Sequence, residues 1–303
     1  METLFSKKLD NNDAQCQTCA HFCVIKPGKR GICGVRENQS GQIKVLNYGK
    51  LVSANIDPIE KKPFFNFLPG TTSYSIAAAG CNFHCGHCQN WQISQIKEAE
   101  KTALQATTVE PKEVVAAAKA TGCTSIAYTY TEPTIYAEFA LDVMKLAREA
   151  KLKNVWVSNG FMSPQTRTAI LPYLDAINID LKSFNNKFYQ KVCGASLKPV
   201  LENISAFKKK GVWIELTTLI IPTWNDQPAE FKQIADFIKN EVGPDTPWHI
   251  SRFSPEISYQ MQDLPTTEVA TIKQALQIGR RAGLKKVYAG NVSNHELEQN
   301  ETT

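Results

Sequence analysis

From Ser73 onward, short apolar runs alternate along the chain with longer stretches of helical period. This alternation is typical of repeated βα units, in which the strands form a parallel sheet. The pattern predicts seven strands, at Ser73–Ala79, Ser125–Tyr130, Asn154–Ser158, Ala176–Asp180, Trp213–Ile220, Trp248–Phe253 and Lys285–Ala289. It predicts helices at Pro111–Thr121, Ile135–Lys151, Ser163–Leu171, Pro199–Lys210, Pro228–Val242 and Thr267–Ala282.

Six or seven such units predict an α/β fold with a partial or complete (β/α) barrel. Parallel strands of a barrel present their carboxyl ends to one mouth, so chemistry is expected just after each strand. Polar residues follow several of these predicted strands, namely Cys81 to Cys88, Thr131 and Glu132, Ser158 and Asn159, Asp180 to Lys182, and Arg252.

The order of these elements also predicts a domain division. Residues 1–72 precede the first strand and carry their own cysteines, which indicates a small metal-stapled N-terminal subdomain. Residues 73–293 form the predicted barrel core, and residues 294–303 form a polar tail that looks loose.

Composition and charge exclude several classes of protein. The 43% hydrophobic and 21% charged residues are ordinary for a soluble globular protein. The net charge of +5 is spread out apart from the run Lys208 to Lys210, which argues against a nucleic-acid binder. The N-terminus, Met1 to Asp13, is polar and no stretch is apolar enough to cross a bilayer, so we expect a cytoplasmic protein without a membrane partner.

Nine cysteines in a cytosolic chain indicate metal or redox chemistry rather than disulfides. Cys81, Cys85 and Cys88 form a C-x3-C-x2-C loop directly after the first predicted strand. Three thiolates this close can hold three irons of a 4Fe-4S cubane and leave the fourth iron open. The alternative is a zinc site with His84 or His87 as fourth ligand, although His84 is otherwise expected to be a solvated loop residue.

A second group, Cys16, Cys19, Cys23 and Cys33, has His21 inside it. Four soft ligands at short spacing fit either a structural zinc or a second iron-sulfur cluster. We favour zinc because the surrounding segment has few apolar residues, and a closed metal site contributes most to folding there. Cys123 and Cys193 stand alone in sequence and are predicted to be buried, inert thiols.

The cluster loop and its surroundings resemble the radical S-adenosylmethionine superfamily, in the group that contains pyruvate formate-lyase activating enzymes. Within it, the chain is similar to radical enzymes of the AmmeMemoRadiSam type. The order of several motifs carries this resemblance: the N-terminal cysteines, Asp57 to Pro63, Phe67 to Gly70, the loop ending Cys88-Gln89-Asn90, and Gly290 to Val292.

The resemblance implies roles for individual residues. Glu132 would accept the amino group of S-adenosylmethionine, although Tyr130 and Thr131 replace the glycines that relatives carry before this acid. The other implied positions are Ser158 and Asn159 for the ribose and His87 stacked on the adenine. Asp180 and Lys182 belong to a cofactor-binding strand end, Asp180-Leu181-Lys182, whose lysine would neutralise the cofactor carboxylate. The alternative for the strand-end residues among these is a capping or turn role.

The resemblance further implies an enzyme that reductively cleaves S-adenosylmethionine at a 4Fe-4S cluster, producing a 5'-deoxyadenosyl radical for hydrogen abstraction. It implies an external electron donor of flavodoxin or ferredoxin type, with AMMECR-type and Memo-type proteins as partners. Two alternatives stay open, namely an activating enzyme for a glycyl radical protein and a non-catalytic iron-sulfur or zinc scaffold or electron carrier. Candidates to line a substrate site, with structural roles equally open, are Trp224, Asn225, His249 and Arg252.

Overall fold

The computed structural model describes residues 1–95 and 106–299. Two compact units make up the chain. The first comprises Met1–His84 with Asn90–Ile177, and the second comprises Cys85–Gln89 with Asn178–Thr303. The cluster loop therefore contributes residues to both units.

The sheet of the first unit combines parallel and antiparallel strands. Its parallel strands are β7 (Thr72–Ala78), β9 (Ser125–Tyr128) and β10 (Lys153–Ser158). Strands β6 (Lys50–Pro58) and β8 (Thr107–Thr108) continue it with antiparallel pairing, in the order β10-β9-β7-β6-β8. All four residues of β9 are buried, as expected for a parallel strand with both faces covered.

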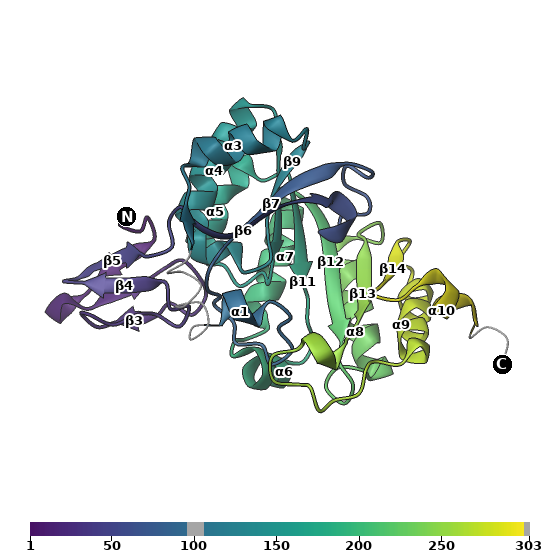
Figure 1. Ribbon diagram of the computed structural model, residues 1–303. Coiled ribbons are helices and arrows are strands. Elements are labelled where there is room, and N and C mark those ends of the chain that lie inside the picture. The colour runs from purple at the N-terminus through teal and green to yellow at the C-terminus, as the bar shows by residue number, and fades with distance from the viewer. Residues whose placement is uncertain (96–105, 300–303) are drawn as a thin grey trace. The chain divides into compact units, whose positions relative to one another are not determined.

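Helices α3 (Pro111–Ala120), α4 (Ala137–Glu149) and α5 (Pro164–Ile170) accompany these strands, and Figure 1 shows them beside β7 and β9. Helix α3 begins with a capping box between Glu110 and Glu113, which satisfies free backbone N–H groups at its start. The short helix α1 (Trp91–Ser94) follows the cluster loop.

The N-terminal segment of the first unit forms two small antiparallel sheets. Strands β1 (Ser6–Lys8), β2 (Ala14–Cys16) and β3 (Val24–Ile25) make one, and the hairpin β4 (Arg36–Gln39) with β5 (Gln42–Val45) makes the other. A small cluster of buried residues holds them, namely Ala14, Cys16, Ile25 and Ile43. Arg36 ties this segment to α4 through a fully buried ion pair with Glu138, at 2.6 Å between Nη2 and Oε2.

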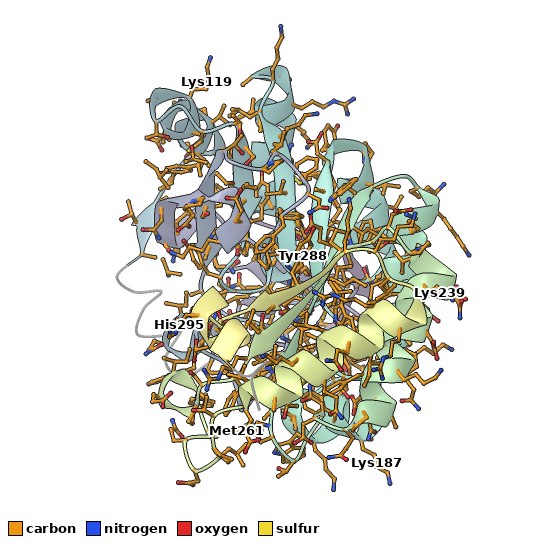
Figure 2. All side chains as sticks on the ribbon, turned by 90° about the vertical axis from the view of Figure 1, so that its right-hand side faces the viewer. Lys119, Lys187, Lys239, Met261, Tyr288 and His295 are labelled. Atoms are coloured by element: carbon orange, nitrogen blue, oxygen red, sulfur yellow. The ribbon has the colours of Figure 1, made fainter. Side chains whose placement is uncertain are left out.

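Strand β11 (Ala176–Asp180) begins at the end of the first unit and runs into the second. In the second unit, β12 (Trp213–Ile220), β13 (Trp248–Arg252) and β14 (Val287–Gly290) pair in parallel in that order. Its helices are α6 (Asn186–Phe188), α7 (Lys198–Lys209), α8 (Pro228–Phe237), α9 (Val269–Ala282) and α10 (Asn294–Gln299). Helix α9 packs on β13 and β14, with Tyr288 labelled on β14 in Figure 2.

The predicted fold class is confirmed, because the structure is a mixed α/β protein with a largely parallel sheet, consistent with a partial barrel. All seven predicted strands are present, and β11 and β12 have the predicted bounds. The predicted helix Ile135–Lys151 instead starts with a 3-10 turn, Pro133–Tyr136, before α4. Helix Pro228–Val242 ends in a π-helical turn, Ile238–Val242.

Two differences concern the ends of the predicted core. The polar tail from Asn294 was expected to be loose, but Asn294–Gln299 is helical, and residues 300–303 lie outside the described part. Strand β6 was not predicted, because its residues are mostly exposed and lack a clean apolar alternation.

The predicted domain division, at residues 72 and 293, stays a prediction. Across residues 1–95 and 106–299, none of the helices has the length and apolar character that spanning a bilayer requires.

Candidate active site

The cluster loop leaves the sheet directly after β7, through Gly80. Gly80 has a φ of +100°, and a Cβ there would lie 2.9 Å from the Cys33 carbonyl oxygen, so only glycine fits without strain. The next residue, Cys81, is half-buried, and its Sγ accepts a hydrogen bond from the Phe83 N–H at 3.3 Å. This backbone donor suits a thiolate at Cys81.

Two asparagines fasten the loop inside the first unit. Asn82 Oδ1 accepts from Asn159 Nδ2 at 2.7 Å, and the Asn82 carbonyl oxygen lies 2.8 Å from His21 Nε2. Farther along, Asn90 Nδ2 donates to the Tyr130 carbonyl oxygen at 2.8 Å. The residues that flank the central cysteines are thereby tied to the ends of β9 and β10 and to the N-terminal segment.

Glu132 is buried and gathers the predicted strand-end residues around its carboxylate. Oε1 accepts from the Thr134 N–H at 3.0 Å, Thr134 Oγ1 at 2.5 Å and Ser158 Oγ at 2.8 Å, while Oε2 accepts from the Asn159 N–H at 2.7 Å. Burial raises the pKa of Glu132, and these hydrogen bonds oppose the rise. The structure therefore brings Glu132, Ser158 and Asn159 together, with Glu132 joining the ends of β9 and β10.

Tyr130, which stands where relatives carry a glycine, has a left-handed backbone with a φ of +61°. Such strain in a non-glycine residue persists only where its surroundings enforce it. The Tyr130 hydroxyl donates to the Asp57 carboxylate, and Lys62 Nζ lies 4.0 Å from the Tyr130 ring centre and 2.7 Å from Asp57 Oδ2. Although burial acts to raise it, hydrogen bonds from Lys61, Lys62 and Tyr130 hold the pKa of Asp57 well below its usual range. Asp57 and Lys62, both in the Asp57 to Pro63 motif, thus hold Tyr130 in its strained backbone conformation.

In the second unit, the loop residue Cys85 is buried beside Cys193. The hydrogen bond with Cys193, together with burial, raises the pKa of Cys85, and His87 lowers it. The adjacent Gly86 N–H donates to the Val192 carbonyl oxygen at 3.1 Å. Cys193 is buried as predicted, but it is not isolated, because the π-helical turn Tyr189–Cys193 places its thiol against a loop cysteine.

His87 is 7% exposed, and its side chain lies close enough to Cys85 to lower the pKa of that thiol. Its ring stacks on Phe188, with 6.2 Å between ring centres. A buried imidazole beside Cys85 places a flat polar ring next to the cluster cysteines. His84, by contrast, is exposed as predicted, with Nδ1 3.1 Å from Gln95 Oε1.

Asp180 and Lys182 at the end of β11 form an ion pair of 2.9 Å. Burial acts to lower the pKa of Lys182, but the charges of Asp180, Cys85 and Cys193 raise it well above its usual value. Lys182 is therefore positively charged close to Cys85. An ammonium group there is suited to binding an anionic group.

Three of the four candidate substrate residues are engaged in structural contacts. Asn225 is 1% exposed and donates to the Lys182 and Leu219 carbonyl oxygens. His249 Nε2 lies 2.6 Å from Glu215 Oε2 in a buried pair, and Arg252 Nη1 lies 2.8 Å from Glu296 Oε1. Trp224 is 38% exposed and stays a candidate.

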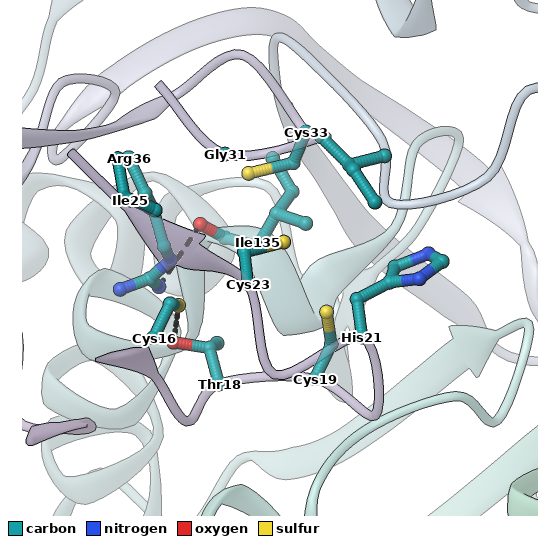
Figure 3. Close-up of a pocket in the computed structure, with 11 residues that line it drawn as sticks. Cys16, Thr18, Cys19, His21, Cys23, Ile25, Gly31, Cys33, Arg36 and Ile135 are labelled. Atoms are coloured by element: carbon teal, nitrogen blue, oxygen red, sulfur yellow. Dashed lines mark hydrogen bonds between the residues drawn. The ribbon is translucent and has the colours of Figure 1, made fainter. Parts of the chain in front are cut away.

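The four N-terminal cysteines line one small cavity of about 10 Å³ in the first unit, shown in Figure 3. The structure thereby brings together Cys16, Cys19, Cys23 and Cys33, which lie as much as 17 positions apart in sequence. Burial raises the pKa of the Cys33 thiol to about 11, and the pKa of Cys19 rises for the same reason.

The cluster loop fits a 4Fe-4S cluster by its donor set and its surroundings. It offers three cysteine thiols outside any disulfide and a backbone N–H that donates to Cys81 Sγ. Within residues 1–95 and 106–299, no three His, Cys, Asp or Glu side chains are already arranged as ligands of one metal ion.

Comparison with known families decides the identity of the fold. A family model described as the Radical SAM superfamily matches residues 75–238, more than half of the chain. The chain belongs to the radical SAM superfamily. Radical SAM proteins are enzymes that use a 4Fe-4S cluster and S-adenosylmethionine, so these cofactors are confirmed and the scaffold alternative does not hold.

Relatives and solved structures agree with this radical SAM assignment. Protein MJ0808 of Methanocaldococcus jannaschii is 46% identical over 98% of this chain and 87% of its own length. The pyruvate formate-lyase-activating enzyme of Clostridium pasteurianum is 22% identical over 53% of this chain and 67% of its own. The structure of Streptococcus suis SuiB bound to S-adenosylmethionine has a TM-score of 0.54 at 15% identity, over 71% of this chain and 49% of that one.

These comparisons support a radical SAM enzyme with homologues among the activating enzymes. This chain spans about half of the length of SuiB, so that likeness concerns the shared fold. None of these relatives bears an AmmeMemoRadiSam name, and that finer assignment stays a prediction.

Sequence reasoning missed the residues that hold the site in place. Asn82, Asn90 and His21 act through contacts with residues far away in sequence, which no local spacing reveals. A signal was present for Asn90, which ends the Cys88-Gln89-Asn90 motif, but its contact with Tyr130 could not be read from it.

Proposed function

We propose that Cys81, Cys85 and Cys88 hold the radical SAM cluster and that this chain abstracts hydrogen from a substrate with the radical obtained from S-adenosylmethionine. The loop itself carries the proposal. Three cysteines outside any disulfide directly follow the first parallel strand of a radical SAM domain, and the first of them already receives a backbone hydrogen bond at Sγ. When bound, the cluster supplies one electron that cleaves the carbon-sulfur bond of S-adenosylmethionine.

The Glu132 network supports a cofactor site at the ends of β9 and β10. Its Oε2 accepts one hydrogen bond, from the Asn159 N–H, whereas Oε1 accepts three, so Oε2 keeps capacity for a bond from an ammonium group. Ser158 and Asn159 are each fixed by hydrogen bonds within the network, which orders them for binding ribose hydroxyls. Glu132 thereby both positions these residues and contributes negative charge.

In the second unit, Lys182 is the residue suited to a carboxylate. Its ammonium group is held by Asp180 at 2.9 Å, and its backbone is fixed by the Tyr189 hydroxyl and the Asn225 amide. His87 offers a flat, buried ring for stacking on adenine. Both roles follow from the chemistry of these side chains together with the family resemblance.

For the pathway, we propose a component of an AmmeMemoRadiSam system that receives its electron from a flavodoxin or ferredoxin and works with AMMECR-type and Memo-type proteins. The order of motifs along the chain supports this assignment.

The second candidate is a glycyl radical activating enzyme. Homologues such as the isethionate sulfite-lyase activating enzyme of Nitratidesulfovibrio vulgaris, which is 26% identical over 34% of this chain, favour this function. Both candidate functions are compatible with the cytoplasmic location that we propose for this protein.

One experiment separates the two candidates. The anaerobically reconstituted chain is reduced and mixed with S-adenosylmethionine, first with the AMMECR-type and Memo-type proteins and then with a glycyl radical enzyme. Faster formation of 5'-deoxyadenosine with the first pair supports the AmmeMemoRadiSam assignment. A glycyl radical signal in electron paramagnetic resonance (EPR) with the second favours the activating enzyme.

A further inference from the structure

The four N-terminal thiols form a site that is separate from the radical SAM loop. We infer that Cys16, Cys19, Cys23 and Cys33 bind one zinc ion in a closed tetrahedral site that anchors the start of the cluster loop. Figure 3 shows their side chains arranged around a common space, with His21 at its edge. All of these residues belong to the first unit.

The donor set is four cysteines rather than three cysteines and His21. His21 Nε2 is engaged with the Asn82 carbonyl oxygen at 2.8 Å, and its ring packs on Phe161 with 4.8 Å between ring centres. His21 Nε2 is therefore committed to the cluster loop, and the four cysteines supply a full tetrahedral set without Nδ1. A set of four thiolates is a common structural zinc site.

Each sulfur also has a polar partner that suits a thiolate. The backbone N–H groups of His21, Ile32 and Val35 reach the sulfurs of Cys19, Cys23 and Cys33. The fourth sulfur, on Cys16, donates to Thr18 Oγ1 at 3.3 Å as a thiol, and rotation of the Thr18 hydroxyl would reverse this bond for a thiolate. Such outer contacts orient metal ligands and stabilise their charge.

The size of the cavity favours one zinc ion over a second iron-sulfur cluster. Its volume of about 10 Å³ is at the threshold for one water-sized occupant. A cubane of four irons and four sulfides would need the surrounding chain to open. A single zinc ion needs four sulfurs at about 2.3 Å from it, a far smaller space.

The position of this site gives it a role in holding the loop. The Cys33 carbonyl oxygen is the atom that a Cβ on Gly80 would meet at 2.9 Å, and Val35 Cγ1 would follow at 3.0 Å. Asn82, which follows Cys81, is hydrogen-bonded to His21 through its backbone carbonyl oxygen. A zinc ion that fixes residues 16–33 would thus fix both neighbours of Cys81.

The test uses the full chain with Cys81, Cys85 and Cys88 all changed to serine, so that radical SAM chemistry cannot affect the result. We expect about one zinc per chain and only background iron by plasma mass spectrometry. Zinc-edge X-ray absorption should then show four sulfur neighbours. Iron with sulfide in place of zinc, no bound metal, or a nitrogen neighbour would overturn the inference.

Variants in the same background identify the ligands. Cys19→Ser with Cys33→Ser should lose the zinc, whereas His21→Ala and the control Cys123→Ser should keep it. Because the double variant can fail to fold, the sulfur count from X-ray absorption stands as the independent measurement. Loss of zinc in His21→Ala alone would contradict the four-cysteine assignment.

Discussion

The side-chain amide of Asn159 donates to the side-chain oxygen of Asn82 at 2.7 Å, which joins the end of β10 to the cluster loop. Asn82 is fully buried, and its own Nδ2 lacks a hydrogen-bond partner among the described residues. The Asn82 Oδ1 atom also accepts from Cys81 Sγ at 3.8 Å, so the Asn159 bond is the shorter of its two hydrogen bonds.

Asn159→Ala should destabilise the protein and loosen the loop. It removes the shorter of two hydrogen bonds to Asn82 Oδ1, and it leaves the buried Phe161 N–H without its acceptor, Asn159 Oδ1, which costs about 1–3 kcal/mol. Denaturant unfolding measures the loss in free energy of unfolding. Because the cluster loop is loosened, the iron bound per chain after reconstitution should also fall. The control Gln39→Ala removes an exposed amide bonded to Glu37 and should change stability little. Equal effects of the two changes would contradict the role of Asn159.

Arg36→Met tests the buried ion pair between the N-terminal segment and α4. Removing Arg36 leaves the Glu138 carboxylate buried without its cation, which costs about 3–5 kcal/mol. Lys198→Met breaks the exposed pair with Glu202 and should cost less than about 1 kcal/mol. Free energies of unfolding at neutral pH compare the two. A small loss for Arg36→Met would show that the segment is held by other contacts.

The same pair predicts a pH dependence. Burial alone would raise the pKa of Glu138, but the charge and hydrogen bonds of Arg36 lower it below its ordinary value of 4.5. The unfolded chain therefore takes up the proton first, so the stabilisation is complete above about pH 4.5 and is lost as the pH falls through the folded-state value. Glu138→Gln should lose most stability above pH 4.5, and its difference from wild type should shrink in acid. A difference that is constant with pH would contradict this.

The sequence predicted elements whose signal is local. Trp213–Ile220 was predicted as a strand and is β12 with the same bounds. Glu132, Ser158 and Asn159 were singled out because they follow predicted strands, and the structure brings them together. Strand β6 escaped because mostly exposed residues give no pattern. The His21 and Asn159 contacts to Asn82 join positions 61 and 77 residues apart, and Cys193 meets Cys85 only through the fold. Those contacts depend on packing, which spacing does not encode.

Glu132→Gln should reduce S-adenosylmethionine cleavage at least tenfold, a loss of about 1.4 kcal/mol or more in binding and positioning. The substitution replaces one carboxylate oxygen with an NH2 group, which cannot accept a hydrogen bond. The side chain then cannot accept from Ser158 and Thr134 at one atom and from the Asn159 N–H at the other. Release of 5'-deoxyadenosine measures the effect. The exposed Glu202→Gln is the control, and cleavage equal to that of the control would remove Glu132 from the site.

Cys193→Ala tests whether the cluster has three or four protein ligands. Cys193 lies beside Cys85, and a fourth thiolate there would close the open iron. We expect iron per chain and the reduced-cluster EPR spectrum to match wild type. Loss of iron, as in Cys85→Ala, would mean that Cys193 is a ligand.

The most direct test of the account adds S-adenosylmethionine to the anaerobically reconstituted, dithionite-reduced protein. The open iron predicts that the EPR spectrum shifts on addition and that 5'-deoxyadenosine appears, and that both signals vanish when Cys81, Cys85 and Cys88 are changed to serine. A reduced cluster whose spectrum ignores the added cofactor, with no 5'-deoxyadenosine formed, would contradict the account.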